Sequence, residues 1–133
     1  MSEMPGMMSH VSVGVNDYQR AVAFYDKILA VVGGRRMMEH PALAAAGYGK
    51  QFPEFWVQKP ADGGPASAGN GAHFGFQAAS KAQVDEFHRA ALAAGATDAG
   101  APGPRPADGK AYYGCFVRDP DGNKIEAAFR GGQ

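Results

Sequence analysis

Two short segments of the chain alternate apolar and polar residues in the way expected of strands that are covered on one side. In HVSVGV, at 10–15, the three valines share one face and His10 lies on the other. In HFGFQA, at 73–78, the two phenylalanines point one way and His73 the other. The pattern predicts two strands, each beginning with a histidine on its polar face.

An amphipathic helix pattern follows each of these segments. Asn16 or Asp17 can cap the first helix and Ser80 the second, and glycines stand just after each pattern, at Gly33 and Gly95. The apolar positions follow the i, i+3, i+4, i+7, i+8 spacing of a helix with one buried face. They are Ala21, Phe24, Tyr25, Ile28 and Leu29 in the first helix, and Val84, Phe87, His88, Ala91 and Leu92 in the second. The shared spacing indicates two copies of one structural module.

The remaining segments complete a β-α-β-β-β order in each copy. Strands are predicted at 35–40, 43–49 and 54–58, and later at 111–117 and 123–129 around a DPDG turn. The proline- and glycine-rich stretch 98–110 predicts only a short strand and a mobile loop. We therefore expect an α+β fold in a single domain, with modules at about 8–58 and 71–130 joined by a linker at 59–70.

The last predicted strand adds a third residue with possible metal-binding chemistry. Ile125, Ala127 and Phe129 form its apolar face, so Glu126 lies on the opposite face, as His10 and His73 do in their strands. If these three faces line one concave surface, the side chains converge. Two neutral imidazoles and one carboxylate suit Fe(II), Mn(II), Zn(II) or Ni(II), and three protein ligands leave coordination positions open.

Composition narrows the partners. Thirteen basic residues balance thirteen acidic ones, which argues against binding to nucleic acid or an anionic membrane. The single cysteine, Cys115, cannot form an internal disulfide and is expected to be a small buried residue. Because no secretory signal or membrane-length apolar run is evident, we expect a soluble cytoplasmic protein that binds a small molecule.

Two segments, HVSVGVNDYQRAVAFYDKIL and FVRDPDGNKIEA, carry a family likeness that extends from about His10 to Phe129. The chain resembles the vicinal oxygen chelate superfamily, which includes glyoxalase I, bleomycin-resistance proteins, fosfomycin-resistance transferases and extradiol dioxygenases. The resemblance implies paired βαβββ modules that form a cupped, mostly antiparallel sheet around a divalent metal, with helices outside. It assigns the metal to His10, His73 and Glu126. The fourth ligand of glyoxalases, a glutamate in the middle of the strand at 54–58, has no counterpart here.

Several functions stay open. The leading hypothesis is an enzyme that chelates a small oxygenated substrate, either a glyoxalase-like lyase or isomerase with Glu126 or Glu54 as base, or a dioxygenase. The alternatives are a non-catalytic antibiotic-binding protein and a thiol transferase. Trp56 and Tyr113 are candidate cup residues for the substrate, although alternation lets only one of Tyr112 and Tyr113 face the cup. Arg105, in a proline-stiffened loop, is a candidate lid residue.

Lys124 or Arg118 could neutralise an anionic substrate, whereas His40 and His88 are not assigned to the metal. The site can form within one chain or between two. The family resemblance favours a homodimer, in which His10 of one subunit meets His73 and Glu126 of the other.

Overall fold

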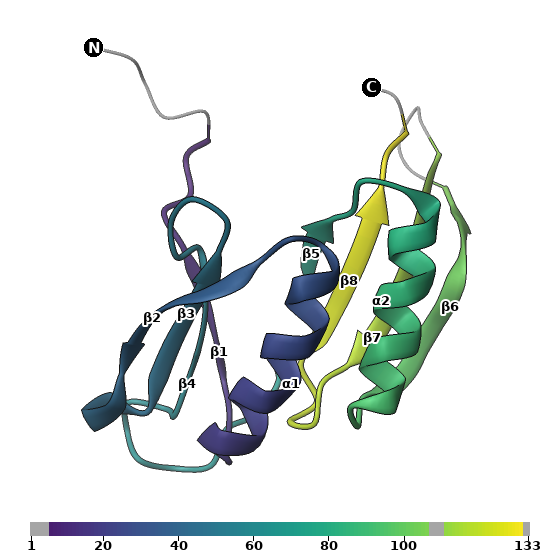
Figure 1. Cartoon of the computed structure of the whole chain (residues 1–133). Helices are drawn as coiled ribbons and strands as arrows, with labels where there is room; N and C mark the ends of the chain where they lie inside the picture. The colour runs from purple at the N-terminus through teal and green to yellow at the C-terminus, as the bar shows by residue number, and fades with distance from the viewer. Residues whose placement is uncertain (1–5, 107–110, 132–133) are drawn as a thin grey trace.

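The computed structural model describes residues 6–106 and 111–131. The first module contains β1 (Val11–Gly14), α1 (Tyr18–Val31), β2 (Arg35–His40), a 3-10 turn η1 (Pro41–Leu43), β3 (Ala45–Gly49) and β4 (Phe55–Gln58). The second contains β5 (Phe74–Gln77), α2 (Lys81–Ala93), β6 (Thr97–Arg105), β7 (Tyr112–Arg118) and β8 (Lys124–Phe129). The predicted α+β fold with two βαβββ modules is confirmed (Figure 1).

Both helices begin where the sequence predicts. The Asp17 carboxylate accepts a hydrogen bond from the Arg20 amide at 3.0 Å, and the Ser80 hydroxyl accepts one from the Gln83 amide at 3.1 Å. After the helices, Gly33 and Gly95 have φ values of +88° and +111°, in the left-handed region that favours glycine.

Each module forms its own four-stranded sheet. The strand orders are β1-β4-β3-β2 and β5-β8-β7-β6, with β1–β4 and β5–β8 parallel and the other pairs antiparallel. Figure 1 shows α1 between the two sheets and α2 against one face of the second. Within the described ranges, one chain therefore carries two separate sheets rather than one continuous sheet, and β1 and β5 each pair along one side only.

The strand β6 is longer than predicted. It runs for nine residues through a segment that the prolines and glycines indicated would form only a short strand and a loop. It lies at the edge of its sheet, where a missing amide proton is tolerated, and its pairing with β7 shifts register between Asp98 and Gly100 and again between Gly100 and Gly103. Part of the predicted mobile loop, 107–110, lies outside the described residues.

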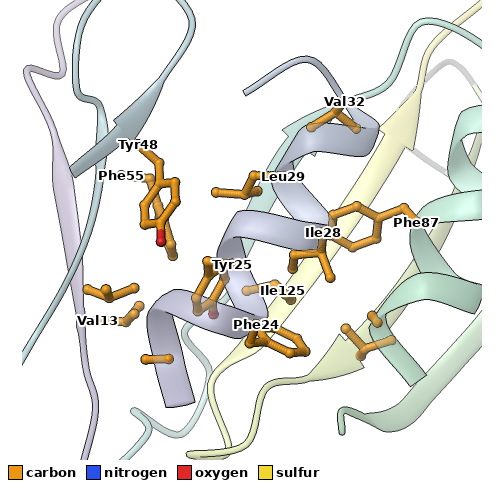
Figure 2. Packing of buried hydrophobic residues seen from close by; sticks show 14 of the residues in the cluster. Val13, Phe24, Tyr25, Ile28, Leu29, Val32, Tyr48, Phe55, Phe87 and Ile125 are labelled. Carbon is orange, nitrogen blue, oxygen red and sulfur yellow. The ribbon is translucent and has the colours of Figure 1, made fainter. Parts of the chain in front are cut away.

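The helix α1 carries much of the core. Figure 2 shows Tyr48 and Phe55 on one side of it and Phe87 and Ile125 on the other. The Phe55 ring also lies 5.1 Å from that of Phe76 on β5, between ring centroids, so both modules contribute to one hydrophobic cluster. No helix in the described ranges is long and apolar enough to span a bilayer.

The predicted DPDG turn joins β7 to β8 and also links the modules. Its Asp119 carbonyl accepts a hydrogen bond from the Gly122 amide at 2.9 Å. The Asn123 side-chain amide donates to the carbonyl of Gly14, at the end of β1, at 3.0 Å. The hydroxyl of the buried Tyr25 donates to Asp119 at 2.5 Å, which ties α1 to the same turn.

Candidate metal and substrate site

Glu126 is the centre of the polar cluster on the second sheet. It lies on the face turned away from α2, which we call the outer face, yet only 5% of the residue is exposed. Two glycines leave room for its carboxylate: a Cβ at Gly75 would lie 3.3 Å from Oε1, and one at Gly114 would lie 3.2 Å from Oε2. The sheet is therefore shaped to hold this carboxylate close to its surface.

Two side chains hold the Glu126 carboxylate. The Tyr112 hydroxyl donates to Oε2 at 2.6 Å, and Nε2 of His73 lies 3.4 Å from Oε1. Burial, followed by the hydrogen bond to Glu126, raises the pKa of Tyr112, so the phenol keeps its proton and acts as a donor at neutral pH. His73 is half-exposed and packs edge-on against Phe116, with the ring centroids 5.8 Å apart. The structure thus brings two of the three predicted metal ligands together.

His10 is placed apart from this pair. It is exposed just before β1, with Nδ1 2.9 Å from the Ser9 hydroxyl. A cavity of about 550 Å³ lies beside β1 and β5, and its lining includes His10, His73 and Glu54. Within the described ranges, no group of three histidine, cysteine or acidic side chains is close enough to hold a metal ion. Inside one chain, the donor set therefore fits a divalent ion only in part.

Trp56 forms an aromatic surface on the first sheet, on the face opposite to the buried Phe55 and Val57. A Cβ at Gly47 would lie 2.7 Å from Cε2 of the indole, which therefore lies directly over β3. The exposed His40 ring lies parallel to this indole, with the ring centroids 5.7 Å apart and 2° between the planes. Glu54 comes immediately before β4.

The two tyrosines of β7 lie on opposite faces, as alternation requires, but Tyr113 is the one on the helix side. Its hydroxyl donates to Asp85 of α2 at 2.7 Å. Cys115 shares that face and is fully buried, as predicted, and burial raises the pKa of its thiol to about 11. The tyrosine beside Glu126 is therefore Tyr112, and not Tyr113. The apolar Cys115 and Val117 were the available signal, because they mark the face of β7 that packs on the core.

Arg105 is the last residue of β6 rather than part of a loop. Its guanidinium lies over the Phe116 ring, 5.4 Å from the centroid, and Nη2 donates to the carbonyl of Ala101. Nζ of Lys124 lies 4.7 Å from the same centroid. Both cations therefore belong to the outer face that holds Glu126.

His88 is not part of this cluster. Its Nε2 lies 2.9 Å from Oδ1 of Asp98, which joins α2 to β6, and this contact lowers the pKa of the Asp98 carboxyl.

A family match covers almost the whole chain. The model of the glyoxalase/bleomycin resistance protein/dioxygenase superfamily matches residues 7–127, and the chain belongs to this superfamily. The resemblance seen in the sequence is confirmed. No curated protein gives a significant match.

Solved structures support the same assignment. A glyoxalase/bleomycin resistance protein from Albidiferax ferrireducens is 39% identical, with a TM-score of 0.86, over 94% of this chain and all of the other. Two others share the fold at lower identity. A glyoxalase/bleomycin resistance protein/dioxygenase family enzyme from Burkholderia phytofirmans is 21% identical, with a TM-score of 0.71 and coverage of 92% and 97%. The fosfomycin resistance protein FosX from Listeria monocytogenes is 18% identical, with a TM-score of 0.64 and coverage of 95% and 94%.

Proposed function

We propose that this protein is a metal-dependent enzyme that binds a small oxygenated substrate by chelation. The observation that carries the proposal is the pair formed by His73 and the buried Glu126 carboxylate, with Tyr112 holding the second carboxylate oxygen. An imidazole and a carboxylate side by side are suitable donors for Fe(II), Mn(II), Zn(II) or Ni(II). The hydrogen bond from Tyr112 orients the ligand, as outer-shell partners of metal ligands do.

We further propose that the third ligand is His10 of the partner subunit in a homodimer. Two features support this arrangement: His10 is exposed on the first module, and β1 and β5 both have an unpaired edge. Unpaired edges are ready to pair with another chain. The buried Cys115 thiol, which has no disulfide partner, fits a reducing compartment, and we propose a cytoplasmic location.

The chemistry of the site follows from its donors. A bound divalent ion with three protein ligands supplies Lewis acidity and open positions for two adjacent substrate oxygens. Glu126 is held in place by Tyr112. In the proposed homodimer, the Trp56 indole on the first sheet would offer a surface for an apolar part of the substrate. Glu54 lines the same cavity as His73 and is the candidate base for removing a proton next to a carbonyl group.

Metal analysis tests the proposal directly. Purified protein is loaded with each of the four metals in turn, dialysed and assayed for stoichiometry. We expect retention of metal by the wild type and its loss in His73→Ala and Glu126→Gln. His88→Gln is the matched control, because that imidazole is bound to Asp98 away from the cluster. A wild type that retains none of these metals, or a His73→Ala variant with unchanged content, would contradict the proposal.

A mixing experiment tests whether two chains share the site. His10→Ala keeps His73 and Glu126, and the double variant His73→Ala/Glu126→Gln keeps His10, so neither homodimer can bind metal. Random exchange of subunits restores one complete site in each heterodimer, or about a quarter of the wild-type metal content. No recovery after confirmed subunit exchange would overturn the shared site.

Turnover is tested with metal-loaded protein and a panel of α-ketoaldehydes with thiols, catechols and antibiotics. Consumption of one of these substrates, in a reaction that requires both bound metal and Glu54, would support the enzymatic function and the proposed base. Tight binding of an antibiotic without turnover would instead support the non-catalytic alternative.

A further inference from the structure

The outer face of the second sheet carries a local excess of positive charge. Among the described residues of β5 to β8, the charged positions on this face include one carboxylate, that of Glu126. The cationic positions include Arg105, Arg118 and Lys124. The whole chain has a formal net charge of zero, so this excess is a property of the face and not of the protein.

Two of these cations are held by an aromatic ring instead of a carboxylate. The Arg105 guanidinium and the Lys124 ammonium lie 5.4 Å and 4.7 Å from the centroid of Phe116. The same ring contacts His73, so one aromatic side chain links both charges to a proposed metal ligand. Within the described residues, neither cation has a carboxylate within salt-bridge distance.

In the described part of the chain, the Arg105 guanidinium lacks a hydrogen-bond acceptor for one of its N–H groups. A Cβ at Gly100 would lie 3.1 Å from Nη2, so the guanidinium lies close over β6, where Nη2 donates to the carbonyl of Ala101. Its Nε is buried and has no hydrogen-bond partner in the described part of the chain. Among the residues that the structure describes, donor capacity of this guanidinium is therefore unused. Glu126 is already bound to Tyr112 and adjacent to His73.

We propose that Arg105 and Lys124 bind an anionic group of the substrate, a carboxylate or a phosphonate, beside the chelating oxygens. This inference rests on the proposed function for its placement next to the metal. The planar guanidinium matches the geometry of either group, and the ammonium of Lys124 adds a second positive charge over the same ring. The substrate class is then a small oxygenated acid, not a neutral aldehyde or a neutral catechol.

Calorimetric titration with small probes tests the inference. Benzoate and phenylphosphonate carry the two candidate groups, and benzyl alcohol is the neutral comparison. We expect the two anions to bind and benzyl alcohol to bind much more weakly. Arg105→Met and Lys124→Met should each weaken anion binding about tenfold, the loss expected for one charge-assisted contact. Arg89→Met is the control, because this arginine pairs with Glu86 on the exposed side of α2.

Two measurements separate this inference from the metal proposal. The metal content of Arg105→Met should equal that of the wild type. Anion binding should persist in Glu126→Gln and in protein treated with a chelator. If metal binding fails while benzoate still requires Arg105, the anion site stands alone. Equal binding of benzoate and benzyl alcohol, or equal weakening by Arg89→Met and Arg105→Met, would overturn the inference.

Discussion

A substitution at Tyr112 should perturb the Glu126 carboxylate most directly. Tyr112→Phe removes the donor to Oε2 and leaves a buried carboxylate with one partner fewer, so we expect a loss of about 1–3 kcal/mol in the free energy of unfolding. Urea denaturation at neutral pH measures the change. Tyr113→Phe is the matched control, because its hydroxyl binds the exposed Asp85 and its loss should cost less. Equal losses in both variants would contradict a special role for Tyr112.

The sequence predicted this cluster in part. Alternation within each strand placed His73 and Glu126 on the polar faces of β5 and β8, and the sheet register brings those faces together. The choice between Tyr112 and Tyr113 needed the orientation of β7 relative to α2. That orientation depends on packing between elements distant in sequence, which a local pattern does not contain.

Gly114 shows how a strand can be adapted to the side chains beside it. A Cβ at this position would lie 2.9 Å from the Tyr112 ring and 3.2 Å from Oε2 of Glu126. Gly114→Ala should therefore displace both groups, lower stability by about 1–3 kcal/mol and reduce metal retention. Thermal unfolding and metal analysis measure the two effects. Gly103→Ala, on the neighbouring strand β6, is the control because its nearest contact would be 4.0 Å away. A Gly114→Ala variant with the stability and metal content of the wild type would show that the close fit at this position is unimportant.

The sequence predicted the helices and strands correctly where the apolar periodicity and the capping residues agreed. It was less successful where proline and glycine content was the main guide. The helices combine an apolar stripe with the caps at Asp17 and Ser80, so two independent signals indicated the same boundaries. In β6, Pro102 and Pro104 suggested a loop, yet an edge strand accommodates both because its outer side needs no hydrogen-bond donors. Edge position is a property of the sheet, not of the segment.

At the scale of the molecule, the sequence predicted the duplicated modules but not how they sit in one chain. The repeat placed a histidine at the start of each module, and the expected cup would bring them together. In the structure, α1 packs between the two sheets, and His10 and His73, immediately before β1 and β5, line one cavity. Local alternation fixes the face on which a side chain lies, whereas docking of modules depends on long-range packing of the α1 core.

We expect the tyrosines to make the stability of the protein sensitive to alkaline pH. Each of the five tyrosines has a raised pKa: Tyr18 to about 12, and Tyr25, Tyr48, Tyr112 and Tyr113 above their usual value of 10.0. For the fully buried Tyr25, burial is the first cause and the charge of Asp119 the next.

The raised pKa values of the tyrosines determine how the stability of the protein changes with pH. Below pH 10 both the folded and the unfolded chain keep these protons, so their contribution to stability is complete. Above pH 10 the unfolded chain loses protons that the folded chain retains, and stability falls until the pH passes the folded pKa values. For Tyr25 alone the slope is about 1.4 kcal/mol per pH unit.

Alkaline titration measures this coupling. We expect the ultraviolet absorbance of tyrosinate to stay low just above pH 10 and then to rise together with the loss of circular dichroism. Tyr25→Phe should be less stable than the wild type at pH 7, because it lacks the hydrogen bond to Asp119, and its stability should approach that of the wild type as the pH rises above 10. If Tyr25 and Tyr48 titrate near pH 10 while the helices remain intact, the core does not bury these two side chains as the structure indicates.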